Sequence, residues 1–124
     1  MTPQLEELFA FLRFPSISTD SRHKNDVSAC ADFLVQKLDS LGLKTEFHET
    51  PGHPIVIARN KHQEGYLNLL IYGHYDVQPV DPVELWDTPP FEPKLKDGVI
   101  FARGATDNKG QMYAHILGVE NYLK

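Results

Sequence analysis

The run from Leu67 to Tyr72 is the feature that most constrains the fold of this chain. Five of its six residues are apolar, and a polar stretch, 61–65, precedes it. A strand with one face in water alternates apolar with polar residues, whereas a nearly continuous apolar run is typical of a strand covered on both faces. We therefore expect this segment to be a buried strand in a sheet that has helices on both sides.

Two segments upstream have the period of amphipathic helices. The first is expected to begin with Thr2 as N-cap and Pro3 as the first helical residue, and Pro15 is expected to end it. The second is expected over residues 25–41, with Gly42 as its stop.

Strand-like and helix-like segments alternate along the rest of the chain. Residues 43–47 alternate in polarity, residues 55–58 are apolar, and residues 99–102 follow an Asp-Gly turn. A third helix is expected over residues 109–124, with an apolar face formed by Met112, Ile116, Val119 and Leu123. Together these patterns predict an α/β fold, a layered sheet with helices on both faces.

A long proline-rich loop is expected over residues 78–96. Long loops inside compact domains are usually functional. Within it, an apolar group is expected to pack together or, less readily, to form a wall beside a substrate. Its members are Trp86, Pro89, Pro90 and Phe91.

The composition of the 124 residues predicts one globular domain, because 41% are hydrophobic and 23% are charged. The net charge of -5 and the absence of a basic run argue against nucleic acid and an anionic membrane as partners. No apolar run approaches the length of a membrane span, and the N-terminus has no signal-like pattern, so a cytoplasmic protein is expected. The single cysteine, Cys30, is expected to be a core residue and excludes an internal disulfide.

Two chemistry-bearing residues, His74 and Asp76, directly follow the apolar run. In open α/β sheets, ligands bind beyond the carboxyl ends of the strands. In an extended segment Asp76 would point to the same side as His74, accept a hydrogen bond from the imidazole and fix its tautomer. The alternative is a structural histidine–carboxylate pair that binds no ligand.

A second carboxylate, Asp107, lies between Gly104 and Gly110, just before the third expected helix. So placed, it would either bind one or two metal ions or cap the helix. Lys109 is expected to be a solvated residue of the first turn or a partner for Asp107. His23, His48 and His62 are expected to be exposed, His53 to lie in a loop, and His115 to lie on the flank of the last helix.

Three ordered blocks carry a resemblance to a known family: GHYDVQPV at 73–80, LWDTPPFEP at 85–93 and DGVIFARGATDNKGQ at 97–111. They resemble the zinc hydrolases that include acetylornithine deacetylase, succinyl-diaminopimelate desuccinylase, aminoacylase and carnosine dipeptidase, and are most similar to the dipeptidase-like branch. The resemblance implies two zinc ions or other divalent metals, with His74 as a ligand of one metal and Asp107 as a bridge between two. It further implies that Asp76 serves catalysis as the partner of His74, and that a cis peptide follows Asp107.

The resemblance also implies that residues 1–124 are an N-terminal fragment of the catalytic α/β domain, with the general base, the remaining ligands and a lid and dimerisation domain further along. The full-length protein is then expected to hydrolyse a peptide or N-acyl amino acid as a homodimer. The isolated chain is expected to be inactive and to self-associate. The alternative function is a non-catalytic module that keeps the fold and binds metal weakly or not at all.

Overall fold

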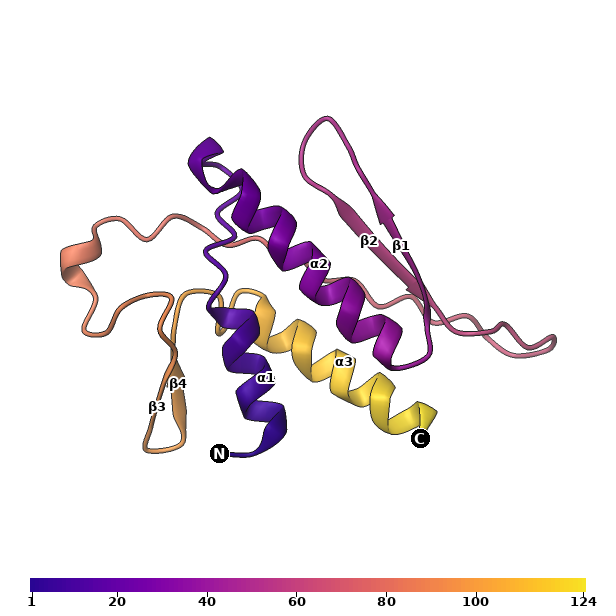
Figure 1. Ribbon diagram of the computed structural model, residues 1–124. Coiled ribbons are helices and arrows are strands. Elements are labelled where there is room, and N and C mark those ends of the chain that lie inside the picture. The colour runs from indigo at the N-terminus through magenta and orange to yellow at the C-terminus, as the bar shows by residue number, and fades with distance from the viewer.

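The computed structural model describes residues 1–124. Three α-helices, four short strands and two turns of 3₁₀-helix make up its regular structure (Figure 1). The helices are α1 (Pro3–Leu12), α2 (Lys24–Ser40) and α3 (Lys109–Leu123). The strands are β1 (Lys44–His48), β2 (Ile55–Arg59), β3 (Lys94–Lys96) and β4 (Val99–Phe101), and the 3₁₀ turns are η1 (Ser21–His23) and η2 (Val83–Leu85).

The helix boundaries follow the local signals in the sequence. The Thr2 hydroxyl accepts a hydrogen bond from the Leu5 backbone N–H at 3.3 Å, and Pro3 occupies the first turn of α1, as expected. Gly42 follows α2 with φ of +81°, a conformation that glycine adopts without steric cost. Both predicted ends are therefore confirmed.

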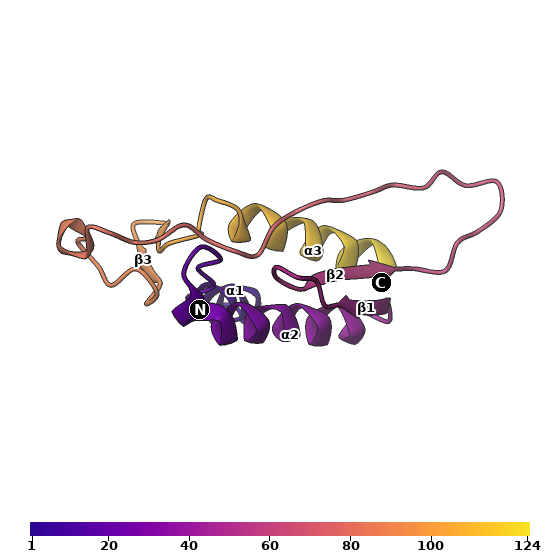
Figure 2. The same cartoon turned by 90° about the horizontal axis from the view of Figure 1, so that it is seen from above.

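The core lies between the three helices, which Figures 1 and 2 show packed around one another. Its fully buried centre is contributed by all three helices and consists of Phe11, Cys30, Leu34, Tyr113 and Ile116. Phe11 of α1 also stacks on Phe33 of α2, with ring centroids 5.4 Å apart. Cys30 is completely buried, which confirms its predicted place in the core.

The strands form two separate antiparallel hairpins. β1 pairs with β2 from Lys44 opposite Arg59 to His48 opposite Ile55, and β3 pairs with β4 across the Asp97-Gly98 turn. Both turn residues have positive φ, as a tight hairpin turn requires. Three of the four strands, β1, β2 and β4, lie where strands were expected, whereas β3 lies at the end of the segment that was expected to be a loop. Within this chain the strands do not join into one layered sheet.

The expectation of a buried strand at Leu67 to Tyr72 is wrong for this chain. The segment has no strand hydrogen bonds, and the side chains of Leu67, Leu69 and Leu70 are 99%, 86% and 90% exposed. Figure 2 shows the segment running outside the helices and the β1–β2 hairpin. A strand forms only where a neighbour supplies hydrogen bonds, and neither hairpin pairs with this run.

The buried face of α3 shares Ile116 with the predicted one and is otherwise rotated from it. Lys109, Tyr113 and Ile116 are buried, whereas Leu123 is exposed and Met112 and Val119 are only half-buried. The buried residues recur at helical spacing, so the predicted helical period is correct, but the predicted buried face lies on a different side of the helix. No helix of the structure is long and apolar enough to cross a membrane.

Candidate metal centre

The segment that carries His74 and Asp76 is fixed against the connection between α1 and α2. Ile17 and Val77 form an isolated parallel bridge, and the Val77 N–H donates to the Ser16 carbonyl at 2.9 Å. The Ser16 hydroxyl donates to the Tyr75 carbonyl at 2.7 Å. Residues 74–77 therefore have a defined backbone, although the apolar run before them is exposed.

The second half of the site is the turn that leads into α3. Gly104 has φ of +86°, and a Cβ at Gly110 would lie only 2.0 Å from the Ala105 carbonyl oxygen, so this tight turn requires glycine at both positions. The peptide bond between Asp107 and Asn108 is cis, as expected.

Asn108 and Gly73 bring the turn and the His74 segment together. The Asn108 side-chain oxygen accepts a hydrogen bond from the His74 backbone N–H at 3.1 Å. A Cβ on Gly73 would lie 2.9 Å from the Met112 sulfur and 3.2 Å from Asn108 Oδ1, so a larger residue here would displace the side chains between the two segments.

The imidazole of His74 lies between two carboxylates. Its Nδ1 is 3.0 Å from Asp76 Oδ1, and its Nε2 is 3.2 Å from Asp107 Oδ1. His74 and Asp76 are partly exposed, and the Asp107 side chain is 74% exposed, so solvent reaches the site. The structure thus brings together all three residues that the motifs singled out.

This arrangement fits part of a metal site. A metal ligand of the histidine type usually donates its second ring N–H to a carboxylate, which is the contact that Asp76 makes. His74 Nε2 and Asp107 Oδ1 lie 3.2 Å apart and would supply two donors. No group of three or more His, Cys, Asp or Glu side chains is positioned to hold a metal ion, so these 124 residues do not form a complete coordination shell.

Lys109 is neither a solvated residue of the first turn nor a partner for Asp107, so both expectations are wrong. It is fully buried, and its Nζ donates to the Phe11 and Phe14 carbonyls at 3.0 and 2.9 Å rather than contacting Asp107 or water. Burial lowers the pKa of this ammonium group. Lys109 therefore ties the beginning of α3, next to Asp107, to the end of α1.

Ser18, which the sequence did not single out, lies next to the site, and so does the loop that carries His53. The Ser18 hydroxyl donates to Asp76 Oδ2 at 2.6 Å, and His53 Nε2 lies 2.7 Å from the Ser18 carbonyl. The loop position of His53 is confirmed. No local motif marks Ser18, because its partner lies 58 positions away in the sequence.

The remaining histidines lie outside this cluster. His48 and His62 are exposed, as expected, and His115 is exposed on the flank of α3. The expected exposure of His23 is wrong, since His23 is half-buried and its Nδ1 lies 2.8 Å from Asp26 Oδ2.

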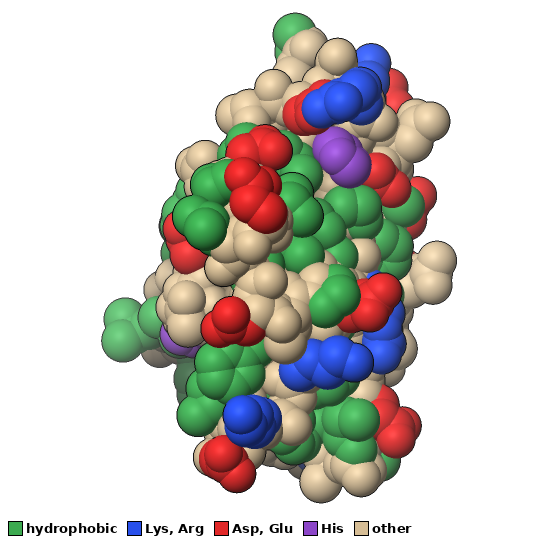
Figure 3. Space-filling view, turned by 90° about the vertical axis from the view of Figure 1, so that its left-hand side faces the viewer, with side chains coloured by type: hydrophobic (Ala, Val, Ile, Leu, Met, Phe, Trp, Pro, Cys, Tyr) green, Lys and Arg blue, Asp and Glu red, His purple; other side chains and the backbone are tan.

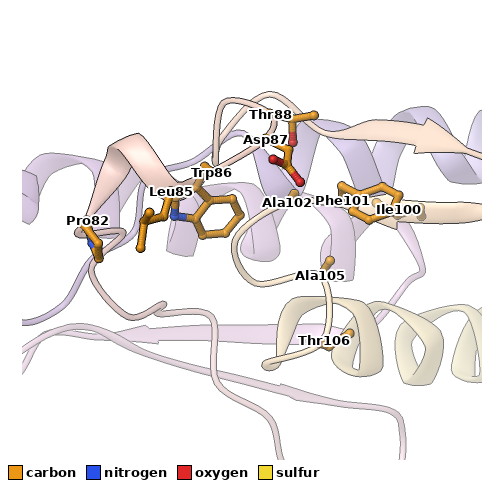
Figure 4. Close-up of a pocket in the computed structure, with 10 residues that line it drawn as sticks. All are labelled: Pro82, Leu85, Trp86, Asp87, Thr88, Ile100, Phe101, Ala102, Ala105 and Thr106. Carbon is orange, nitrogen blue, oxygen red and sulfur yellow. The ribbon is translucent and has the colours of Figure 1, made fainter.

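A cavity of about 370 Å³ opens next to the turn that carries Asp107 (Figure 4). The Trp86 ring points into it from the loop, Phe101 comes from β4, and Ala105 and Thr106 lie on the turn. The Trp86 indole N–H donates to the Val80 carbonyl at 2.9 Å, and the Arg103 guanidinium lies 5.0 Å from the Trp86 ring centroid. These two contacts hold the Trp86 side chain in place within the loop.

The rest of the loop packs less completely than predicted. Pro90 is buried and Phe91 half-buried, but Pro89 is exposed. On this side of the molecule, basic, acidic and apolar side chains are interspersed (Figure 3).

A histidine that contacts one carboxylate and faces a second has the partners that a metal-ligating histidine usually has. Residues 70–124, which include all three of these side chains, match Peptidase family M20/M25/M40. The chain thus shares sequence motifs with this family, which confirms the resemblance that the three blocks predicted.

Individual relatives agree with this match. The chain is 35% identical over 117 residues to the Cys-Gly metallodipeptidase dug1 of Schizosaccharomyces pombe, a match that covers 86% of this chain and 25% of that protein. The M20 family metallo-carboxypeptidase of Sulfolobus solfataricus superposes with a TM-score of 0.87 at 37% identity, over 99% of this chain and 28% of that one. Human carnosine dipeptidase 1 gives a TM-score of 0.90 at 26% identity, over 97% and 28% of the respective chains.

These comparisons confirm the mixed helix-and-strand fold as that of M20 metallopeptidase structures. The chain spans about a quarter of the length of the relatives that it matches.

Proposed function

We propose that residues 1–124 are the N-terminal part of the catalytic domain of a metal-dependent hydrolase that cleaves a peptide or N-acyl amide bond. The observation that carries the proposal is the 3.2 Å approach of His74 Nε2 to Asp107 Oδ1, with Asp76 behind the imidazole. The relatives support the same class, because they include a metallodipeptidase, a metallo-carboxypeptidase and a carnosine dipeptidase. A dipeptidase-like activity is the finer form of the proposal.

In this proposal the full-length enzyme holds two zinc ions. His74 Nε2 would be a ligand of one, and the two oxygens of Asp107 would be shared between both. Bound zinc ions would lower the pKa of a shared water and stabilise the negative charge that develops on the amide oxygen.

The protein side chains have separate roles at this centre. Asp76 accepts the Nδ1 hydrogen of His74, so that Nε2 keeps its lone pair on the side of Asp107. Asn108 holds the backbone of His74 against the turn that carries Asp107. The general base and the remaining ligands are proposed to lie in the rest of a longer chain, as is a domain that forms a homodimer.

The cavity beside Thr106 supports a substrate role for the loop. Its volume of about 370 Å³ is sufficient for an amino-acid side chain, and Leu85, Trp86 and Phe101 make its wall largely apolar. We assign it to an apolar side chain of the peptide or acyl amino acid.

The test is the metal content and dipeptide hydrolysis of the full-length protein with the single substitutions His74→Ala and Asp107→Ala. Both variants are expected to lose bound zinc and turnover together, while His48→Ala, an exposed histidine of β1, keeps both. Zinc retained by both site variants would refute the ligand assignment. A wild-type protein that neither holds zinc nor hydrolyses dipeptides would instead favour a non-catalytic module with the same fold.

A further inference from the structure

Both oxygens of the Asp76 carboxylate are occupied by named partners. Oδ1 lies 3.0 Å from His74 Nδ1, and Oδ2 accepts the Ser18 hydroxyl hydrogen at 2.6 Å. The Asp76 backbone carbonyl lies 3.2 Å from the same Nδ1, so this nitrogen has two acceptors, of which the carboxylate is the nearer. A carboxylate bonded through one oxygen only can rotate, whereas one bonded through both has a fixed plane. The Asp76 side chain is 41% exposed, so water would compete for either oxygen if its protein partner were removed.

Ser18 is itself held in place by its neighbours. Ile17, the preceding residue, is buried in the parallel bridge to Val77. His53 Nε2 lies 2.7 Å from the Ser18 carbonyl, and because a carbonyl only accepts, this nitrogen must donate. The loop that carries His53 is closed in turn by the Thr50 hydroxyl, which donates to the His53 carbonyl at 2.7 Å.

From this geometry we propose that Ser18 is a positioning residue for His74. Its hydroxyl fixes the Asp76 carboxylate, so that Oδ1 adds to the backbone carbonyl as an acceptor of the Nδ1 hydrogen and favours the tautomer in which Nε2 keeps its lone pair toward Asp107. Ser18 touches neither ligand atom and acts only through Asp76. The role of Nε2 as a metal ligand rests on the proposed function, but the effect of Ser18 on the tautomer of His74 does not.

Ser16 provides a matched control. It lies two residues away on the same segment, and its hydroxyl also donates to residues 74–77, at 2.7 Å. Its acceptor, however, is the backbone carbonyl of Tyr75 and not a carboxylate. Loss of the Ser16 hydroxyl should therefore weaken the fold without releasing Asp76.

The experiment compares Ser18→Ala, Ser18→Thr, Ser18→Val and Ser16→Ala in the metal-free protein. Long-range ¹H–¹⁵N correlation spectra, recorded at one pH at which the imidazole is neutral, report which ring nitrogen of His74 carries the hydrogen. In wild type, Ser18→Thr and Ser16→Ala we expect mainly the Nδ1–H form, because Nδ1 has two acceptors and Nε2 has one, Asp107 Oδ1. In Ser18→Ala and Ser18→Val the carboxylate of Asp76 is released, and we expect a larger share of the Nε2–H form. Thr and Val have nearly the same shape, so this pair isolates the hydroxyl even if Ser18→Ala fails to fold.

Zinc affinity of the same variants, made in the full-length protein, gives a second measurement. Loss of a partner behind a metal-ligating histidine typically weakens metal binding ~10- to 100-fold, and this is expected for Ser18→Val but not for Ser18→Thr. If Ser18→Val kept the wild-type tautomer, the positioning role would be refuted. A protein that binds no zinc, but whose His74 tautomer still depends on the Ser18 hydroxyl, would refute the proposed function and leave the positioning role standing.

Discussion

At the scale of single residues, Lys109 replaces a hydrogen bond that the backbone cannot make. The Phe11 carbonyl at the end of α1 would normally accept from the N–H four residues later, but that residue is Pro15, which has none. The Lys109 ammonium donates to this carbonyl at 3.0 Å and to that of Phe14 at 2.9 Å. A cation at a helix C-terminus is also favoured by the helix dipole.

We therefore predict that Lys109→Met, which keeps the length of the side chain, destabilises the protein. It leaves a buried carbonyl without a donor, which costs ~1–3 kcal/mol of unfolding free energy. Urea unfolding measures the difference, and Lys94→Met in β3 is the control because Lys94 is exposed. Equal losses in the two variants would show that the contacts of Lys109 with α1 do not stabilise the fold.

Tyr75 links the site segment to the loop before β2, because its hydroxyl donates to the Pro54 carbonyl at 2.5 Å. Burial raises the pKa of Tyr75 from 10.0 to about 12, so the folded state keeps a proton that the unfolded state loses above pH 10. The stabilisation by this tyrosine should therefore be complete below pH 10 and decline as the pH rises toward 12.

The corresponding prediction is that Tyr75→Phe is less stable than wild type by ~0.5–1.5 kcal/mol at neutral pH. The difference should shrink steadily in urea unfolding curves recorded above pH 10. Tyr72→Phe is the control, because Tyr72 is 82% exposed and its hydroxyl has no protein partner. A constant difference between Tyr75→Phe and wild type across this range would contradict the assigned pKa.

The residues at the site differ in how far the sequence reveals them. His74, Asp76 and Asp107 lie in short motifs beside an apolar run or a glycine turn, so residue type and spacing are sufficient to select them. Ser18 and Lys109 act through partners that are 58 and 98 positions away. Serine and lysine are ordinary surface residues, and only the folded backbone shows that one supports Asp76 and the other closes α1.

At the scale of elements, the helices, three of the four strands and the Asp97-Gly98 turn were predicted because their signals are local, whereas β3 lies in a segment expected to be a loop. α1 has its cap and its proline in the sequence, and the β3–β4 turn has its Asp-Gly pair. The phase of α3 was wrong because Lys109 points inward, which no polarity pattern predicts. The prediction of a buried strand at Leu67 to Tyr72 was wrong for a different reason. A buried strand needs neighbouring strands to pair with, and this chain supplies none.

The same exposed run predicts self-association. An apolar segment with unpaired backbone groups can pair with a second copy of itself, whereas a charge on the segment opposes this. We expect the wild-type chain to associate by light scattering at ~100 μM, a concentration at which exposed apolar surface begins to aggregate. Leu70→Lys should reduce the association, and Leu85→Lys should not, because Leu85 is equally apolar and exposed but lies in η2. If the two substitutions reduced the association equally, the run from Leu67 to Tyr72 would not be the contact between copies.

At the scale of the whole molecule, the scaffold is sufficient to orient His74 toward Asp107 and insufficient to complete a metal centre. The core between α1, α2 and α3 fixes the two segments that meet at the site, and His74 is held on both sides. Yet His74 and Asp107 supply only two facing donors, whereas structural zinc sites use four protein ligands and catalytic sites three. No carboxylate in the described site is left free to act as a general base, because Asp76 is engaged by Ser18 and His74.

We therefore predict that the 124-residue chain does not hydrolyse dipeptides at an enzymatic rate, even with added zinc. A positioned general base alone typically contributes ~10²–10⁴-fold to the rate, and incomplete coordination also weakens the hold on the metal. A ligand stabilises a fold only if its concentration exceeds its dissociation constant for the folded state. Added zinc should therefore leave the thermal unfolding midpoint of this chain nearly unchanged. The measurements are dipeptide turnover and thermal unfolding, each with zinc and with a chelator. Zinc-dependent turnover that disappears in His74→Ala would show that these residues form a working active site by themselves.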